Sequence, residues 1–299
     1  MSFRLPQITC MFALLASAIV LPCGTTQTAG GAAEKVSASF PPLEQWKNAV
    51  VSGNVSALKV LYSTNPPARV MKAAGQNGID LDLSSEVAFW MGLRASRMRL
   101  DVIQVDSPQI GTRQIVFQAE MEPPFGSGGH TVYIIDGQLW QQQGEQWRLV
   151  ATKRGDPTRL KQPTSLTKDI YPPSIDAHAE IKHALAQAAK DHKRIILVFG
   201  ANWCYDCHVL DLAFHRPDIS ALLASNYEVV HVDVGQGDKN QDLMQQYHVP
   251  MVKGIPALAV LDSSGKLLYS QTGGEFEHAR SLAPEDLLQF LNKWKPVSK

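Results

Sequence analysis

The chain has 299 residues, which is enough for one or two domains with a sizeable hydrophobic core. Lys and Arg together number 28, as do Asp and Glu, so no charge excess favours nucleic acid or an anionic surface as partner. The hydrophobic fraction, 44%, is that of an ordinary globular protein.

The N-terminal segment 1–33 has the pattern of a secretory signal peptide. Arg4 gives it a positive start, the apolar run over 8–21 is short for a membrane span, and small residues follow. An uncleaved membrane anchor is one alternative. Lipidation at Cys23 is another, although Pro22 stands where a small residue is needed. We therefore expect an exported protein, periplasmic or otherwise extracytoplasmic.

The next region, 40–155, begins with helical periodicity. Apolar residues over 43–61 fit one or two amphipathic helices with a break at Gly53-Asn54. The pair Ser84-Ser85 offers candidate caps for a further helix.

The second half of this region has the alternating period of β-strands. Helices followed by a run of antiparallel strands predict an α+β domain. The strands are expected over 100–105, 113–121, 131–141 and 147–152, with a hairpin turn at Gly144-Glu145 before the last.

That order of elements, ending in GQLWQQQGEQWRLVATKRGD, resembles the nuclear-transport-factor-2-like (SnoaL-like) superfamily over residues 40–155. The resemblance implies a cone in which a curved antiparallel sheet wraps over the N-terminal helices. Such domains include enzymes, ligand-binding proteins and dimerisation modules, so an oligomer formed through this domain is one expectation. Side chains that could line a cavity, although aromatics at these spacings more often form a core, are Trp90, His130, Tyr133, Asp136 and Trp140.

A break in the pattern separates this region from the rest of the chain. Residues 156–173 include four prolines and have no apolar period, which predicts a linker. Ser174 is a candidate N-cap for a helix that opens a second domain, 174–299. The predicted order there is α-β-α-β-α-β-β-α, a mixed sheet with helices on both faces, with strands over 195–199, 229–234, 257–261 and 266–270.

One strand-to-helix turn in this domain, IILVFGANWCYDC, contains Cys204 and Cys207. Unpaired N–H groups and the dipole at a helix N-terminus favour the thiolate of Cys204. Cys207 lies about one turn further on, near enough to attack a mixed disulfide formed on Cys204. The spacing therefore predicts a redox dithiol.

Two other interpretations of the cysteine pair are weaker. A structural disulfide that closes so small a loop would constrain the unfolded chain little. A zinc site would need a fourth ligand besides His208, and the sequence has no second C-x-x-C motif and no H-x-x-x-H motif. If signal cleavage follows Cys23, Cys204 and Cys207 are the only cysteines of the mature chain, as suits an oxidising compartment. No metal is expected.

Several separate features accompany the dithiol. They are Trp203 before Cys204, the strand VVHVDV, Gly254-Ile255-Pro256 ahead of another strand, and the turn at 262–265. Together they resemble the thioredoxin superfamily over residues 174–296, and most closely its Trp-Cys-x-Asp-Cys subset. The resemblance implies a cis proline at Pro256 beside the dithiol, with an ordinary trans turn as the alternative. It also implies that Trp203, Ile255 and Pro256 form the surface on which a substrate strand docks.

Departures from the family pattern concern the chemistry of the cysteines. The carboxylate of Asp206 should raise the pKa of Cys204, whereas a charged His208 would lower it, unless His208 is simply a first-turn helix residue. The buried acid that many thioredoxins carry on the preceding strand is replaced by Val198. Proton assistance to Cys207 must then come from elsewhere, with Asp206 or water as candidates.

These observations predict an exported thiol–disulfide oxidoreductase that acts on protein thiols and disulfides. It needs no bound cofactor, and a partner, expected to be a membrane-linked redox protein, restores the state of its dithiol. Reductant, oxidant and isomerase roles all fit the sequence. Two alternatives come from other classes: a binding or chaperone module with little turnover, and a small-molecule enzyme or carrier in the N-terminal cone with an accessory redox domain.

Overall fold

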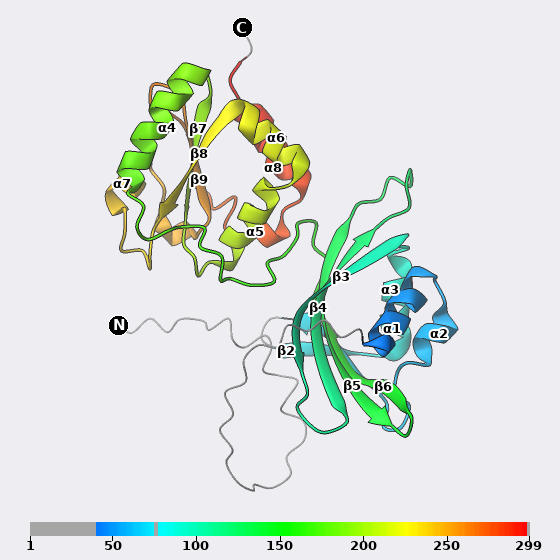
Figure 1. Ribbon diagram of the computed structural model, residues 1–299. Helices are drawn as coiled ribbons and strands as arrows, with labels where there is room; N and C mark the ends of the chain where they lie inside the picture. Colours follow the sequence, from blue (N-terminus) through cyan, green and yellow to red (C-terminus); the bar gives the residue numbers. More distant parts are fainter. Residues whose placement is uncertain (1–39, 75–76, 298–299) are drawn as a thin grey trace, which may run out of the picture. The chain divides into compact units, whose positions relative to one another are not determined.

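The computed structural model describes residues 40–74 and 77–297, and the chain divides into two compact units, Met1–Pro157 and Thr158–Lys299 (Figure 1). The predicted signal peptide, with Cys10 and Cys23, lies outside the described residues. Within the described residues, no helix has both the length and the apolar character needed to cross a membrane.

Three helices pack on one face of the curved N-terminal sheet (Figure 1). The first begins with Pro41 and Pro42, where the missing amide hydrogens cost nothing, and it buries Leu43 and Trp46. The third is capped by Asp82, whose side chain accepts from Ser85 N, so the expected cap at Ser84-Ser85 is wrong. The helices are α1 (Pro41–Val51), α2 (Val55–Lys59) and α3 (Leu83–Gly92).

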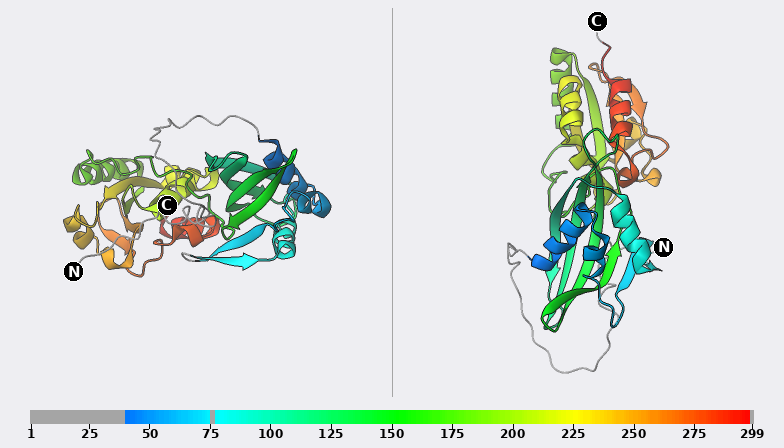
Figure 2. Two further views of the ribbon diagram at one scale, coloured as in Figure 1. Left: turned by 90° about the horizontal axis from the view of Figure 1, so that it is seen from below. Right: turned by 90° about the vertical axis from the view of Figure 1, so that its right-hand side faces the viewer.

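The N-terminal sheet has six strands in the order β2-β1-β6-β5-β4-β3. All neighbours pair antiparallel except β1 and β6, which are parallel, so the expected all-antiparallel sheet is corrected at one pairing. The left view of Figure 2 shows β1 and β2, in cyan, at one edge of the sheet. The strands are β1 (Arg69–Ala74), β2 (Asn77–Leu81), β3 (Arg97–Asp106), β4 (Thr112–Glu122), β5 (Val132–Gln143) and β6 (Gln146–Arg154).

The C-terminal unit is built on a four-stranded mixed sheet in the order β10-β9-β7-β8. Strand β7 pairs parallel with β8 and antiparallel with β9, which in turn pairs antiparallel with β10. The mixed sheet predicted from the sequence is thereby confirmed. The strands are β7 (Arg194–Gly200), β8 (Tyr227–Asp233), β9 (Ala257–Leu261) and β10 (Leu267–Ser270).

Helices cover both faces of this sheet, because the central strand β7 is apolar on both sides. Ile195, Leu197 and Phe199 pack under α4 (Ala177–Asp191) and α7 (Gln241–Gln246). Ile196 and Val198 face the opposite layer, which Figure 1 shows on the other side of the sheet. That layer consists of α5 (Tyr205–Phe214), α6 (Pro217–Asn226) and α8 (Pro284–Trp294).

Two short 3-10 helices complete the unit, η3 (Met251–Lys253) and η4 (Ala279–Ser281). Helix α4 is capped by Asp176, which accepts from His178 N and Ala179 N, rather than by Ser174 as expected.

The segment expected to be a linker is mostly part of the C-terminal unit. From Thr158 onward it belongs to that unit, and Leu160, Ile170 and Tyr171 are buried in the core on the α5 side of the sheet. We call residues 158–173 the strap. Its buried residues are unevenly spaced, so no period in the sequence marks them.

Candidate active site

The two cysteines lie at the turn between β7 and α5. Cys204 is the N-cap of α5, and its Sγ accepts a hydrogen bond from the backbone N–H of Cys207 at 3.1 Å. The two residues form a disulfide, with their Cα atoms 5.3 Å apart. Both residues are buried, Cys204 at 5% exposure and Cys207 at 2%, so Cys204 is slightly the more exposed residue.

The three predicted docking residues, Trp203, Ile255 and Pro256, differ in how far each is exposed to solvent. Trp203 is 44% exposed, and its indole N–H donates to Gly235 O at 2.8 Å, which fixes the ring at the surface. The carbonyl oxygen of Ile255 lies 3.5 Å from Cys204 Sγ. The Ile255–Pro256 peptide bond is cis. Pro256 itself is buried.

Asp206, between the cysteines, is paired with an arginine distant in sequence. Its carboxylate accepts from the backbone N–H of Arg280 at 2.8 Å, from Nε at 3.0 Å and from Nη2 at 2.5 Å. This bonding raises the pKa of Arg280, and the guanidinium also stacks 4.6 Å from the centre of the Tyr205 ring. The negative charge that was expected to act on Cys204 is therefore offset by the positive charge of Arg280, in η4. The sequence does not indicate this ion pair.

His208 is buried and contacts the turn rather than solvent. Its Nε2 lies 2.8 Å from the carbonyl oxygen of Asn202, which can only accept, so this nitrogen carries the proton. The imidazole thereby holds the turn that leads into Cys204, as expected for a residue of the first helical turn.

Asn202 joins the same turn to the strap. Its Oδ1 accepts from the backbone N–H of Tyr171 at 2.8 Å, and its Nδ2 donates to the carbonyl of Tyr171 at 2.9 Å. Further along the strap, Lys168 pairs with the buried Asp211 of α5 at 2.5 Å. The sequence-based interpretation missed these contacts, because the strap looked like a linker.

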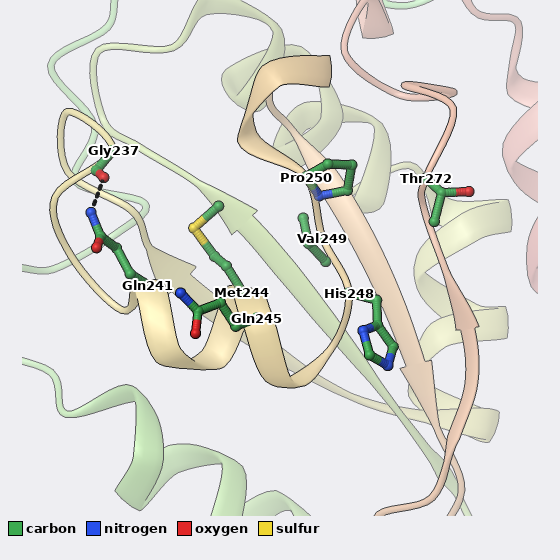
Figure 3. Close-up of a pocket in the computed structure, with 8 residues that line it drawn as sticks. All are labelled: Gly237, Gln241, Met244, Gln245, His248, Val249, Pro250 and Thr272. Carbon is green, nitrogen blue, oxygen red and sulfur yellow. Dashed lines mark hydrogen bonds between the residues drawn. The ribbon is translucent and has the colours of Figure 1, made fainter.

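A groove of about 650 Å³ lies along α7 and the segment that follows it (Figure 3). Neither cysteine lines it, so it is separate from the dithiol. Its lining residues are Gly237, Gln241, Met244, Gln245, His248, Val249, Pro250 and Thr272. Over the described ranges 40–74 and 77–297, no group of three or more His, Cys, Asp or Glu side chains is arranged to hold a metal ion.

The cavity candidates of the N-terminal domain belong to its core, apart from the exposed His130. Trp90, Tyr133 and Trp140 are buried, as is Asp136, whose carboxylate accepts from Thr152 Oγ1 at 2.7 Å and Gln138 Nε2 at 2.9 Å. Burial, followed by the nearby charge of Glu86, raises the pKa of Asp136 to about 7.

Glu86 is a second buried carboxylate in this core, and no pattern in the sequence indicates it. It accepts from Trp90 Nε1 at 2.6 Å and from Arg154 Nε at 2.7 Å. Burial raises its pKa, although the bonded guanidinium opposes the shift. Each of the two carboxylates is hydrogen-bonded to buried partners, which is typical of a structural core.

Residues 176–263 match a family model described as thioredoxin-like. The C-terminal domain is thioredoxin-like. The chain is also similar to the disulphide isomerase from Xylella fastidiosa Temecula1, with 41% identity over 42% of this chain and 97% of that one, at a TM-score of 0.41. No curated protein matches the chain.

The N-terminal domain has an α+β fold, with three helices packed on a six-stranded sheet. Two solved structures similar to this chain are NTF2-like proteins of unknown function. The one from Rhodospirillum rubrum ATCC 11170, described as in nutrient uptake, has 20% identity over 38% of this chain and 93% of its own, with a TM-score of 0.32. The one from Shewanella oneidensis MR-1 has 11% identity over 39% and 94%, with a TM-score of 0.31.

Proposed function

We propose that the protein is an exported thiol–disulfide oxidoreductase that acts on cysteines of other proteins. The observation that carries the proposal is the Cys204–Cys207 disulfide at the N-terminus of α5 in a thioredoxin-like domain. A helix N-terminus stabilises a thiolate, and a second cysteine three residues on is placed to resolve a mixed disulfide.

The reaction uses the two sulfurs in sequence. In the reduced protein the Cys204 thiolate attacks a substrate disulfide, forming a mixed disulfide and releasing one substrate thiolate. Cys207 then attacks Cys204 Sγ, which restores the internal disulfide and releases the second substrate sulfur. In the opposite direction the internal disulfide accepts two electrons from a substrate dithiol. Attack falls to Cys204 because it is the more exposed of the pair and its Sγ caps the helix.

Substrate contact is assigned to Trp203 and the backbone of Ile255. The exposed indole offers an apolar surface, and the Ile255 carbonyl lies beside Cys204 Sγ, where an extended substrate segment would find a backbone acceptor. A membrane-linked redox protein is the proposed partner that restores the working state of the dithiol.

The test is the equilibrium reduction potential of the dithiol, measured by thiol trapping across glutathione buffers. A potential well below that of glutathione would make the protein a reductant, and one above it an oxidant or isomerase, with roughly 30 mV corresponding to about 1.4 kcal/mol. The variants C204S and C207S should show no two-electron transition. A wild-type pair that never equilibrates with glutathione would contradict the proposal and favour a binding module.

A further inference from the structure

Tyr171 of the strap has a buried hydroxyl group with no hydrogen-bond partner among the described residues. The side chain is 1% exposed. A buried hydroxyl that loses its hydrogen bonds to water without replacing them destabilises the fold. The position of this group therefore requires an explanation.

The hydroxyl lies beside the resolving sulfur, as the geometry at Gly200 demonstrates. A Cβ atom added to Gly200 would lie 2.8 Å from Cys207 Sγ and closer still to Tyr171 Oη. Both atoms are therefore within 2.8 Å of one point, and no more than twice that distance apart. Only a glycine at the end of β7 leaves this space to the hydroxyl and the sulfur.

The ring of Tyr171 is fixed from two sides. Its backbone N–H and C=O both bond the Asn202 side chain, two residues before Cys204. Its ring packs edge-on against His231 of β8, with the ring centres 5.3 Å apart. These contacts hold the phenol in the neighbourhood of Cys207 Sγ.

The charged and titratable groups around Tyr171 keep it protonated. Burial is the main cause that raises its pKa above the ordinary value, and the carboxylates of Asp211 and Asp233 raise it further. The other facing group, His231, has its pKa lowered by burial. Tyr171 is therefore a hydrogen-bond donor, and not a base, through the neutral pH range. Strand β7, with the sequence RIILVFG, brings no carboxylate to the dithiol.

We propose that the Tyr171 hydroxyl donates a hydrogen bond to Cys207 Sγ once the internal disulfide is open, and so stabilises the thiolate that resolves the mixed disulfide. This inference rests on the proposed function. A hydrogen bond to the charged form of a group favours that form, and the bond is strengthened by the thiolate charge and the dry surroundings.

The step balances without a further reactant. The Cys207 thiol releases its proton to water, and the thiolate forms a bond to Cys204 Sγ. The bond between Cys204 Sγ and the substrate sulfur breaks, and the substrate leaves as a thiolate that takes up one proton. Tyr171 keeps its own proton throughout, so it acts on the rate and not on the stoichiometry.

The experiment separates the two steps with 5,5′-dithiobis(2-nitrobenzoate) as the substrate disulfide. The reduced full chain, with C10S and C23S, releases one thionitrobenzoate when Cys204 attacks and a second when Cys207 resolves. In Y171F we expect the second release to be about tenfold slower at pH 7, with its pH midpoint raised by about one unit. The first release should keep its rate, because Cys204 is stabilised by α5.

Two further variants make the result specific. In G200A the added Cβ enters the space between the hydroxyl and the sulfur, so the second release should slow in the same way. Y227F is the matched control, because it removes a buried hydroxyl that donates to Leu291 O at 2.6 Å near the opposite end of the sheet. It should leave both steps unchanged.

The outcomes distinguish the inference from the function on which it rests. An unchanged second release and pH midpoint in folded Y171F would overturn the role of Tyr171 while leaving the oxidoreductase proposal intact. Equal slowing of both releases would also overturn it, since that would indicate a general packing defect. A wild-type protein that releases no thionitrobenzoate would overturn the proposed function and this inference with it.

Discussion

Each domain buries carboxylates, but the partners of those carboxylates differ in exposure. In the N-terminal domain Glu86 is fully buried, and the side chain of its partner Arg154 is only 6% exposed. In the C-terminal domain Asp206 is buried, but the side chain of Arg280 is 48% exposed. When both members of an ion pair are buried, each carboxylate depends on its cation to offset the cost of burial. When the cation is half-exposed, water can replace part of the interaction. We therefore expect the Glu86–Arg154 pair to contribute mainly to stability. We expect the Asp206–Arg280 pair to act mainly on the electrostatics of the cysteines.

The largest effect is expected from R154M, because it leaves the Glu86 carboxylate buried without its cation. The N-terminal domain should lose about 3–5 kcal/mol of unfolding free energy. Urea denaturation of the full chain, followed by hydrogen exchange of peptides from each domain, measures this loss. R97M is the control, since Arg97 pairs with Glu122 at the surface and its loss should leave the unfolding free energy almost unchanged. Equal losses in the two variants would erase the contrast between enclosed and open pairs.

The pH dependence of the N-terminal domain tests the second enclosed carboxylate. Burial and Glu86 raise the pKa of Asp136 to about 7, above the value of about 3.9 of an unfolded chain. Between these values the folded state holds a proton that the unfolded state has released, so stability falls as pH rises through this window. The total change is roughly 4 kcal/mol at most.

The variant D136N isolates this contribution. Its domain stability should vary less between about pH 4 and pH 7 than that of the wild type, because the amide cannot ionise. Denaturation midpoints at a series of pH values compare the two proteins. Identical slopes would show that Asp136 does not titrate in this window.

The smallest effect is expected at the half-exposed pair of the C-terminal domain. In R280M the Asp206 carboxylate loses its cation next to Cys204, so the pH midpoint of Cys204 alkylation should rise by about one unit, or about 1.4 kcal/mol. Iodoacetamide rates in the C207S background report this midpoint. The double variant D206N/R280M should return it toward the wild-type value. If R280M left the midpoint unchanged, Asp206 would have no electrostatic role at the dithiol.

Local patterns in the sequence were sufficient for strands β3 to β6, for the C-terminal sheet and for the position of the cysteine pair. Strands β4 to β6 contain apolar residues and are separated by turn residues, and the C-x-x-C motif lies directly between a strand and a helix. Strands β1 and β2 were not predicted. Their stretch, RVMKAAGQNGIDL, has few large apolar residues, and only Val70 and Met71 of β1 are buried.

The contacts missed at the site join residues that are distant in sequence. Asp206 and Arg280 are separated by 74 positions, and Tyr171 and Asn202 by 31. No periodicity relates such residues, and the prolines around Tyr171 made its segment resemble a linker. Gly200 was the one residue that could have indicated the position of Tyr171, because a glycine in a strand often marks a close approach by another group.

The strap also determines where this domain can be cut. The thioredoxin-like match begins at residue 176, five positions after Tyr171. A gene fragment that starts at that boundary would encode both cysteines, α5 and the whole sheet, yet omit the tyrosine that closes over the end of β7. Recombination at the family boundary would thus transfer the dithiol to a new protein without its hydroxyl. In this chain the compact C-terminal unit, which includes the strap, starts at Thr158.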